Sequence, residues 1–168
     1  MTERGDMNRR AFAHGRLHLV VRARDGSHVA ERRARNLVLQ AGAELVASLF
    51  AGADGAKAID TVMVGFGADG ADAGATTLTP PADESIHASE LRSPVQKDDF
   101  AVATDKDDRT VRVSVATVFH PSVELAGVTE AGLLAGDRLY NQVVFEPVTL
   151  RPGQDVTFFW EIDFPFGH

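Results

Sequence analysis

The chain has 168 residues, a formal net charge of −7 at pH 7 and no cysteine. This length suits one domain that buries a core without covalent cross-links, and the lack of cysteine excludes disulfides and thiolate chemistry. No apolar run is long enough to span a membrane, and the N-terminus is charged where a signal peptide is apolar. We therefore expect a soluble protein made in the cytoplasm.

The charge is distributed unevenly along the chain. Residues 1–35 hold nine arginines and four acidic residues, a net charge of +5, and the remaining 8 basic and 20 acidic residues give −12. Arginine contacts phosphate well, so nucleic acid is one possible partner, but the alternate spacing of the arginines also suits the solvent-facing side of a strand. A protein partner is the favoured interpretation, because a basic segment on one copy could bind the acidic body of the next.

A hairpin is predicted near the start of the domain. From Arg16 the apolar and polar residues alternate, as they do in a strand with one face in water. Asp25-Gly26 is typical of a tight turn, and residues 28–38 would return antiparallel with Val29 facing the core.

A short helix is predicted near residues 38–51. Apolar residues recur there at steps of three and four, which is the helical period, and form one stripe: Leu37, Val38, Ala41, Leu45, Val46, Leu49 and Phe50. Asn36 can cap the start of this helix through its side-chain oxygen, and Gly52 can end it because glycine tolerates positive φ. A β-branched strand closed by two glycines follows at residues 59–67.

The second half of the chain reads mainly as strands. Residues 68–92 are rich in Gly, Ala, Asp and Pro, which predicts a long loop that is functional or mobile. Residues 121–136 could form a strand with a bulge at Gly127 or a short helical turn that ends at Gly136, and the extended form is favoured. The last strand carries the largest aromatic load, with Trp160 on its core-facing side. The strands expected after the loop are 94–104, 110–120, 138–148 and 154–164.

These elements predict a mainly β fold. Six to seven mostly antiparallel strands with one short α-helix near residues 38–51 are typical of a β-sandwich. Residues 1–15 are polar and have no periodicity, so they are expected to form a flexible basic arm. Residues 16–168 would form a single sandwich domain with the long loop at 68–92.

No pattern indicates catalysis, a cofactor or a metal. The six histidines contain no HxH or HExxH, and the adjacent carboxylate pairs fall in predicted turns or strand edges. Gly65, Gly67 and Gly70 fit the pattern GxGxxG, but the residues that follow are predicted to form a loop, whereas a dinucleotide-binding site needs a helix there. No serine has the setting of a hydrolase nucleophile. We therefore predict that the protein is not an enzyme.

Several phrases, taken in order, resemble a family of proteins. They are Asn36–Gly42, the helix Glu44–Gly52, the strand Met63–Gly67, Leu78-Thr79, Glu90–Arg92, the TEAGL phrase Thr129–Leu133 and the final strand Phe158–Phe164. This order resembles phage and prophage structural proteins of tails or baseplates, a class also found in phage-like contractile injection systems. The chain departs from that pattern in its arginine-rich N-terminus and in the loop at Pro81–Glu84.

The resemblance implies a non-enzymatic structural subunit of a virion or phage-like particle, assembled in the bacterial cytoplasm. We expect it to form a ring or trimer with itself and to bind other particle proteins, with nucleic acid an unlikely partner. The interface candidates are Arg9, Arg10, Arg16, Arg22, Arg24, Arg32, Arg33, Arg35 and Phe159.

Three alternatives stay open. A host-surface carbohydrate-binding module would need exposed aromatic residues, yet Trp160 and Tyr140 are each more easily explained as core. A capsid decoration or connector protein is a variant of the same structural role. A small metal enzyme on a β-barrel would need clustered histidines, which the sequence does not show.

Overall fold

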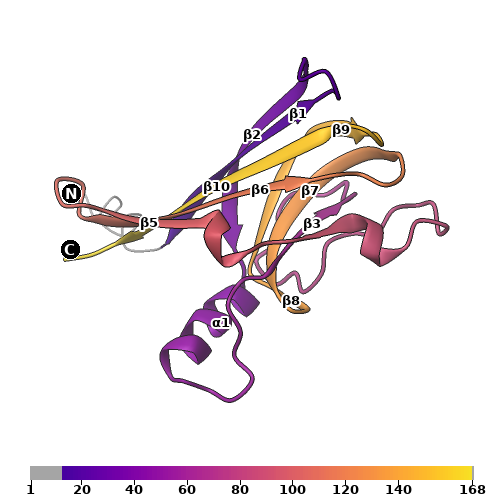
Figure 1. Ribbon diagram of the computed structural model, residues 1–168. Helices are drawn as coiled ribbons and strands as arrows, with labels where there is room; N and C mark the ends of the chain where they lie inside the picture. Colours follow the sequence, from indigo (N-terminus) through magenta and orange to yellow (C-terminus); the bar gives the residue numbers. More distant parts are fainter. Residues whose placement is uncertain (1–12, 168) are drawn as a thin grey trace, which may run out of the picture.

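The computed structural model describes residues 13–167 (Figure 1). The elements in chain order are β1 (His14–Arg22), β2 (His28–Val38), α1 (Gln40–Phe50), β3 (Thr61–Gly65), η1 (Ala88–Leu91), β4 (Arg92–Pro94), η2 (Lys97–Asp99), β5 (Phe100–Asp105), β6 (Thr110–Phe119), β7 (Leu125–Ala135), β8 (Arg138–Leu139), β9 (Asn141–Leu150) and β10 (Asp155–Pro165). The prediction of a mainly β, antiparallel fold with one α-helix is confirmed. The predicted number of strands is too low, because the structure has ten. Residues 14 and 15 belong to β1 and not to an arm; the rest of the predicted arm lies outside the described residues, apart from Ala13.

All ten strands belong to one sheet that curls into a half-barrel (Figure 1). Its order is β4-β3-β7-β9-β2-β1-β10-β6-β5, with β8 paired to β7. The predicted sandwich of two separate sheets is not confirmed, because β2 pairs with both β1 and β9 and so connects the two groups of strands. The curl brings β4 close to β6, where Thr117 Oγ1 lies 3.5 Å from the Pro94 carbonyl oxygen.

The junction between β2 and β9 is short, and we call it the seam. Only Asn36, Leu37 and Val38 pair with β9, and the rest of β2 diverges from that strand. Arg32 spans the divergence: its Nε donates to the Glu146 carbonyl oxygen at 2.8 Å and its Nη2 to that of Pro147 at 2.6 Å. This arginine, predicted as an interface residue, thus has an internal role.

One apolar cluster fills the concave side of the sheet, with residues from β1, β3, β6, β7, β9 and β10. The predicted core face of the last strand is confirmed, since Trp160 is fully buried and its ring stacks on that of Phe158 at 5.5 Å. Tyr140 is also buried, and loss of solvation raises the pKa of its hydroxyl to about 12. Val29 is exposed and not core-facing, because the β1–β2 register shifts beside it.

The helix starts later than predicted. Asn36 belongs to β2 and does not cap it; α1 begins after Leu39, which makes no side-chain cap. Gly52 has φ of +63°, as expected of a residue that ends a helix. The helix approaches the sheet closely at Gly42, where an added Cβ would overlap the Tyr140 carbonyl oxygen.

The later elements follow the predictions with one main change. Residues 94–104 are not one strand: the chain forms β4, the turn η2 and then β5. The extended segment with a bulge is confirmed as β7, where Gly127 has φ of +72° beside a register shift.

The long loop is held against the convex face of the sheet by a buried carboxylate. Glu130 on β7 is only 1% exposed. Its Oε1 accepts hydrogen bonds from the backbone N–H of Thr79 at 2.6 Å and of Gly67 at 3.2 Å, and its Oε2 accepts one from Gln142 Nε2 at 2.7 Å. A buried charge is tolerated when its oxygens are satisfied in this way. We call these four residues the Glu130 network.

Two further contacts extend this network. The Gln142 side-chain oxygen accepts a hydrogen bond from the Asp72 backbone N–H at 3.0 Å, so both ends of that amide are used. A Cβ on Gly65 would lie 2.6 Å from Glu130 Oε1, which explains a glycine at that position without positive φ. The first part of the predicted loop is therefore fixed to β7 and β9.

The Glu130 network predicts the outcome of an exchange of two side chains. Glu130→Gln should lower the free energy of unfolding by about 2 kcal/mol, because one donor then faces another donor. Gln142→Glu alone should cost more, since it sets two carboxylates side by side. The double variant should recover most of the loss, because the new amide donates to the new carboxylate, which still accepts from Asp72. Urea unfolding of the four proteins measures this; additive losses would contradict the arrangement.

Candidate assembly surfaces

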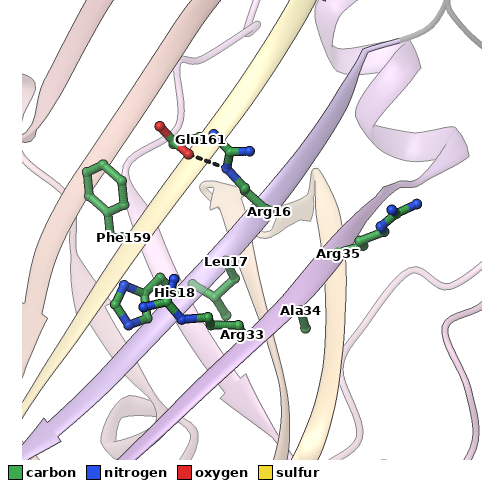
Figure 2. A pocket seen from close by; sticks show the side chains of 8 residues that line it. All are labelled: Arg16, Leu17, His18, Arg33, Ala34, Arg35, Phe159 and Glu161. Carbon is green, nitrogen blue, oxygen red and sulfur yellow. Dashed lines mark hydrogen bonds and ion pairs between the residues drawn. The ribbon is translucent and has the colours of Figure 1, made fainter.

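The first candidate surface is on the convex face of β2, β1 and β10. A hollow of about 360 Å³ opens there, and we call it the basic hollow (Figure 2). The strand register sets two rows of side chains across it. One row reads Arg35, Arg16 and Glu161. The next row reads Arg33, His18 and Phe159. Leu17 and Ala34 complete the lining.

Two carboxylates neutralise part of this positive charge. Arg16 Nε donates to Glu161 Oε2, a pair drawn in Figure 2. Glu31, next to the hollow, lies 2.7 Å from Arg33 Nη2 and 2.7 Å from His18 Nε2. The hydrogen bond from Arg33, followed by that from His18, lowers the pKa of Glu31. Both arginines are thus paired within the chain.

Arg35 differs from these two arginines. Its side chain is exposed and makes no hydrogen bond or ion pair with any other residue between 13 and 167. Figure 2 shows its side chain pointing away from the Arg16–Glu161 pair. No acidic group among residues 13–167 neutralises its charge, and Phe159, 37% exposed in the next row, adds an apolar contact.

The sequence predicted four of the residues that the hollow brings together: Arg16, Arg33, Arg35 and Phe159. The other candidates lie elsewhere. Arg22 donates to the Gly26 carbonyl oxygen at 3.2 Å within the hairpin, Arg24 is exposed at its turn, and Arg32 spans the seam. Arg9 and Arg10 lie outside the described residues.

An ion pair beside the hollow was not found from the sequence. Arg112 on β6 donates to both oxygens of Asp163 on β10, at 2.6 and 3.1 Å. This hydrogen bonding lowers the pKa of Asp163 and raises that of Arg112. The alternation of apolar and polar residues in the two strands indicates that Arg112 and Asp163 each lie on the polar face of their strand. Only the register of β6 and β10 shows that they lie opposite each other.

The second candidate surface is an apolar stripe on α1. Ala43, Val46, Ala47 and Phe50 follow the spacing i, i+3, i+4, i+7, and all four are exposed, as is Leu49. Phe50 is 94% exposed. Of the apolar residues predicted to form one stripe on this helix, Leu45 is buried, whereas Val46, Leu49 and Phe50 are exposed. Figure 1 shows α1 extending away from the sheet.

Between residues 13 and 167, no group of three or more His, Asp or Glu side chains is placed to hold a metal ion. Among the described residues, His18, His28 and His120 each lie within 4 Å of a single carboxylate, and His14 lies 3.6 Å from Asp163. No helix in the same part of the chain is long and apolar enough to cross a membrane.

Comparisons of the chain with protein-family models, curated proteins and solved structures found no match. The resemblance to phage structural proteins therefore stands on the sequence phrases alone.

The Arg112–Asp163 pair predicts a pH dependence of stability. The folded-state pKa of Asp163 is depressed, so the pair stabilises the fold above the ordinary carboxyl pKa and loses this effect as the pH falls through the folded value. Asp163→Asn should cost about 1 kcal/mol at neutral pH, since Arg112 is partly exposed and keeps Glu161 within reach. From about pH 5 to pH 2 it should then lose less stability than the wild type.

Thermal or urea unfolding across this pH range measures the difference. Asp137→Asn is the control, because Asp137 also pairs with an arginine but its side chain is 95% exposed. Equal acid sensitivity of Asp163→Asn and wild type would contradict the assignment.

Proposed function

We propose that the protein is a non-enzymatic structural subunit of a phage tail, baseplate or related phage-like particle. It assembles with copies of itself, as a ring or trimer, and with neighbouring particle proteins. The observation that carries this proposal is the exposed apolar stripe of α1. A stripe of this kind on a protein with a well-filled core is typical of an interaction surface.

The energetics of the stripe favour a protein partner. Covering Phe50 contributes about 2 kcal/mol, and covering the half-exposed Val46 and Leu49 adds roughly 1 kcal/mol each. The spacing of these residues matches the anchors of a helix that lies in the groove of another protein. A neighbouring subunit that buries the stripe therefore gains several kcal/mol from one helix.

The basic hollow supports the same role through charge. Arg35 has no acidic partner among the described residues, whereas residues 36–168 carry a net charge of −12. A contact between this arginine and a carboxylate of the next copy would be electrostatic and therefore sensitive to salt.

The Glu130 network brings together sequence phrases that carry the resemblance. Three of them, Met63–Gly67, Leu78-Thr79 and Thr129–Leu133, meet there through Gly67, Thr79 and Glu130. These phrases are far apart in sequence yet satisfy one buried carboxylate. They therefore form one structural unit in this chain.

A carbohydrate-binding module is the second candidate. Trp160 and Tyr140 are buried, so the aromatic contact available in the basic hollow is Phe159, which lines it together with Glu161. Binding on a glycan array that is lost in Phe159→Ala would favour this function. Decoration or connection of a capsid is a variant of the lead proposal and is distinguished by the particle proteins that co-purify.

The apolar stripe predicts a specific loss of assembly. Phe50→Gln should weaken the assembly at least about tenfold, because a polar group replaces the largest exposed apolar anchor. Glu44→Gln, on the polar side of the same helix, should leave it unchanged. Light scattering at several protein concentrations measures both. Equal assembly by Phe50→Gln and wild type would remove the observation on which the proposal rests.

The basic hollow predicts a salt effect. The molar mass of the wild type should fall as salt rises from about 0.05 to 0.5 M. Arg35→Gln should weaken assembly several-fold at low salt and have no effect at high salt. Arg24→Gln is the matched control, an exposed arginine that lies outside the hollow. A loss of the same size in both variants would assign the effect to net charge.

A further inference from the structure

The outer edge of β5 is open. β5 is the last strand of the sheet and pairs with β6 over Phe100–Asp105 without a register shift. Along its other side no strand lies among residues 13–167, and every β5 residue after Phe100 is exposed. Figure 1 shows β5, β6 and β10 extending together beyond the other strands. An edge of this kind presents unpaired backbone N–H and C=O groups to a further strand.

A row of apolar side chains crosses β10, β6 and β5 and ends at the outer edge of β5. Ile162 on β10 is opposite Val113 on β6, which is opposite Val102 on β5. Ile162 is buried in the core, whereas Val102 is 69% exposed. A strand added beside β5 would continue this row and cover Val102.

The other free edges of the sheet are guarded, and β5 is not. β4 has three residues, includes Pro94 and approaches β6 through the Pro94 carbonyl oxygen. The divergent part of β2 is spanned by Arg32. Proteins commonly protect an edge with proline, lysine or a bulge. β5, with the sequence FAVATD, has none of these.

The symmetry of an antiparallel pair identifies a second copy as a fitting partner. Opposite residues in such a pair point to the same side of the sheet, and a two-fold axis normal to the sheet keeps the core side of both copies on one side. A residue of β5 can therefore face a residue of the same parity in the other copy. An axis at Val102 sets valine against valine, with the small Ala101 and Ala103 opposite each other.

We propose that two copies of this chain join their sheets by antiparallel pairing of β5 with β5, with Val102 on the two-fold axis. The proposal shares with the proposed function only the premise that copies associate, and it does not depend on a phage-like particle. Backbone hydrogen bonds and the covered valines hold this contact. Each end gathers three acidic residues and one basic residue, where Asp98 and Asp99 of one copy approach Lys106 and Asp105 of the other, so high salt should screen their repulsion and leave the contact intact.

Sedimentation equilibrium of the full chain carrying Phe50→Gln, in about 0.5 M NaCl, tests the pairing, because the apolar stripe is then disrupted and the contact through Arg35 is screened. We expect twice the monomer mass for this protein and at least a tenfold weaker dimer when Val102→Lys is added. Val118→Lys in the same background is the matched control, since Val118 is an exposed valine on the neighbouring strand β6. A monomeric Phe50→Gln protein, or a Val102→Lys variant of it that dimerises equally, would overturn the proposal.

Single cysteines give an independent measurement, because the chain contains none. Under mild oxidation, Val102→Cys should form a disulfide-linked dimer and Val118→Cys should not. Equal cross-linking of the two variants would overturn the assigned register even if Val102→Lys failed to fold. The two proposals can fail separately. A high-salt dimer that depends on Val102 supports the β5 pairing even if substitution of Phe50 and Arg35 leaves low-salt assembly unchanged. Conversely, assembly that depends on Phe50 and Arg35 supports the proposed function even if substitution of Val102 has no effect.

Discussion

The convex side of this fold depends on the need to satisfy one buried carboxylate. Glu130 has almost no contact with solvent, so its oxygens take donors from the end of β3, the long loop and β9. A buried charge that lost these donors would destabilise the protein far more than each hydrogen bond stabilises it. The end of β3, the long loop and β9 are therefore held together by their shared contacts with Glu130. The same requirement explains why Gly65, whose absent side chain leaves space for the carboxylate, is found beside it.

Much of the secondary structure follows from local patterns. Alternation identified the hairpin, the core face of β10 and the bulged β7, because each depends on residues close in sequence. The single curled sheet could not be predicted in this way, since it depends on three residues of β2 that pair with β9 about a hundred positions later. The prediction of Asn36 as a helix cap is wrong because the apolar run after it suits a strand end as well as a helix start. The sequence does contain a signal for Glu130, because this acidic residue lies in the otherwise apolar strand β7. The glycines that lie beside it, Gly65 and Gly67, are distant in sequence.

The candidate surfaces show where sequence patterns stop being informative. Alternation of the arginines correctly set Arg16, Arg33 and Arg35 on one face, and the pleat of β10 brought Phe159 to the same place. For α1, the pattern identified an apolar stripe but not which part of it is covered. The helical period shows which residues share a face of the helix, but the packing of strands distant in sequence decides whether that face is buried. In both surfaces, therefore, the residues on one face can be predicted from the sequence and the exposure of that face cannot.

The seam between β2 and β9 divides the sheet into two groups of strands. On one side of it lie β4, β3, β7 and β9, and on the other side β2, β1, β10, β6 and β5 are joined by long ladders. Between the groups, β2 and β9 contribute three residue pairs, and the Arg32 side chain adds two hydrogen bonds to the β9 backbone. Both groups also contribute side chains to the one apolar cluster on the concave side. The two groups are therefore held together by side-chain packing more than by backbone pairing.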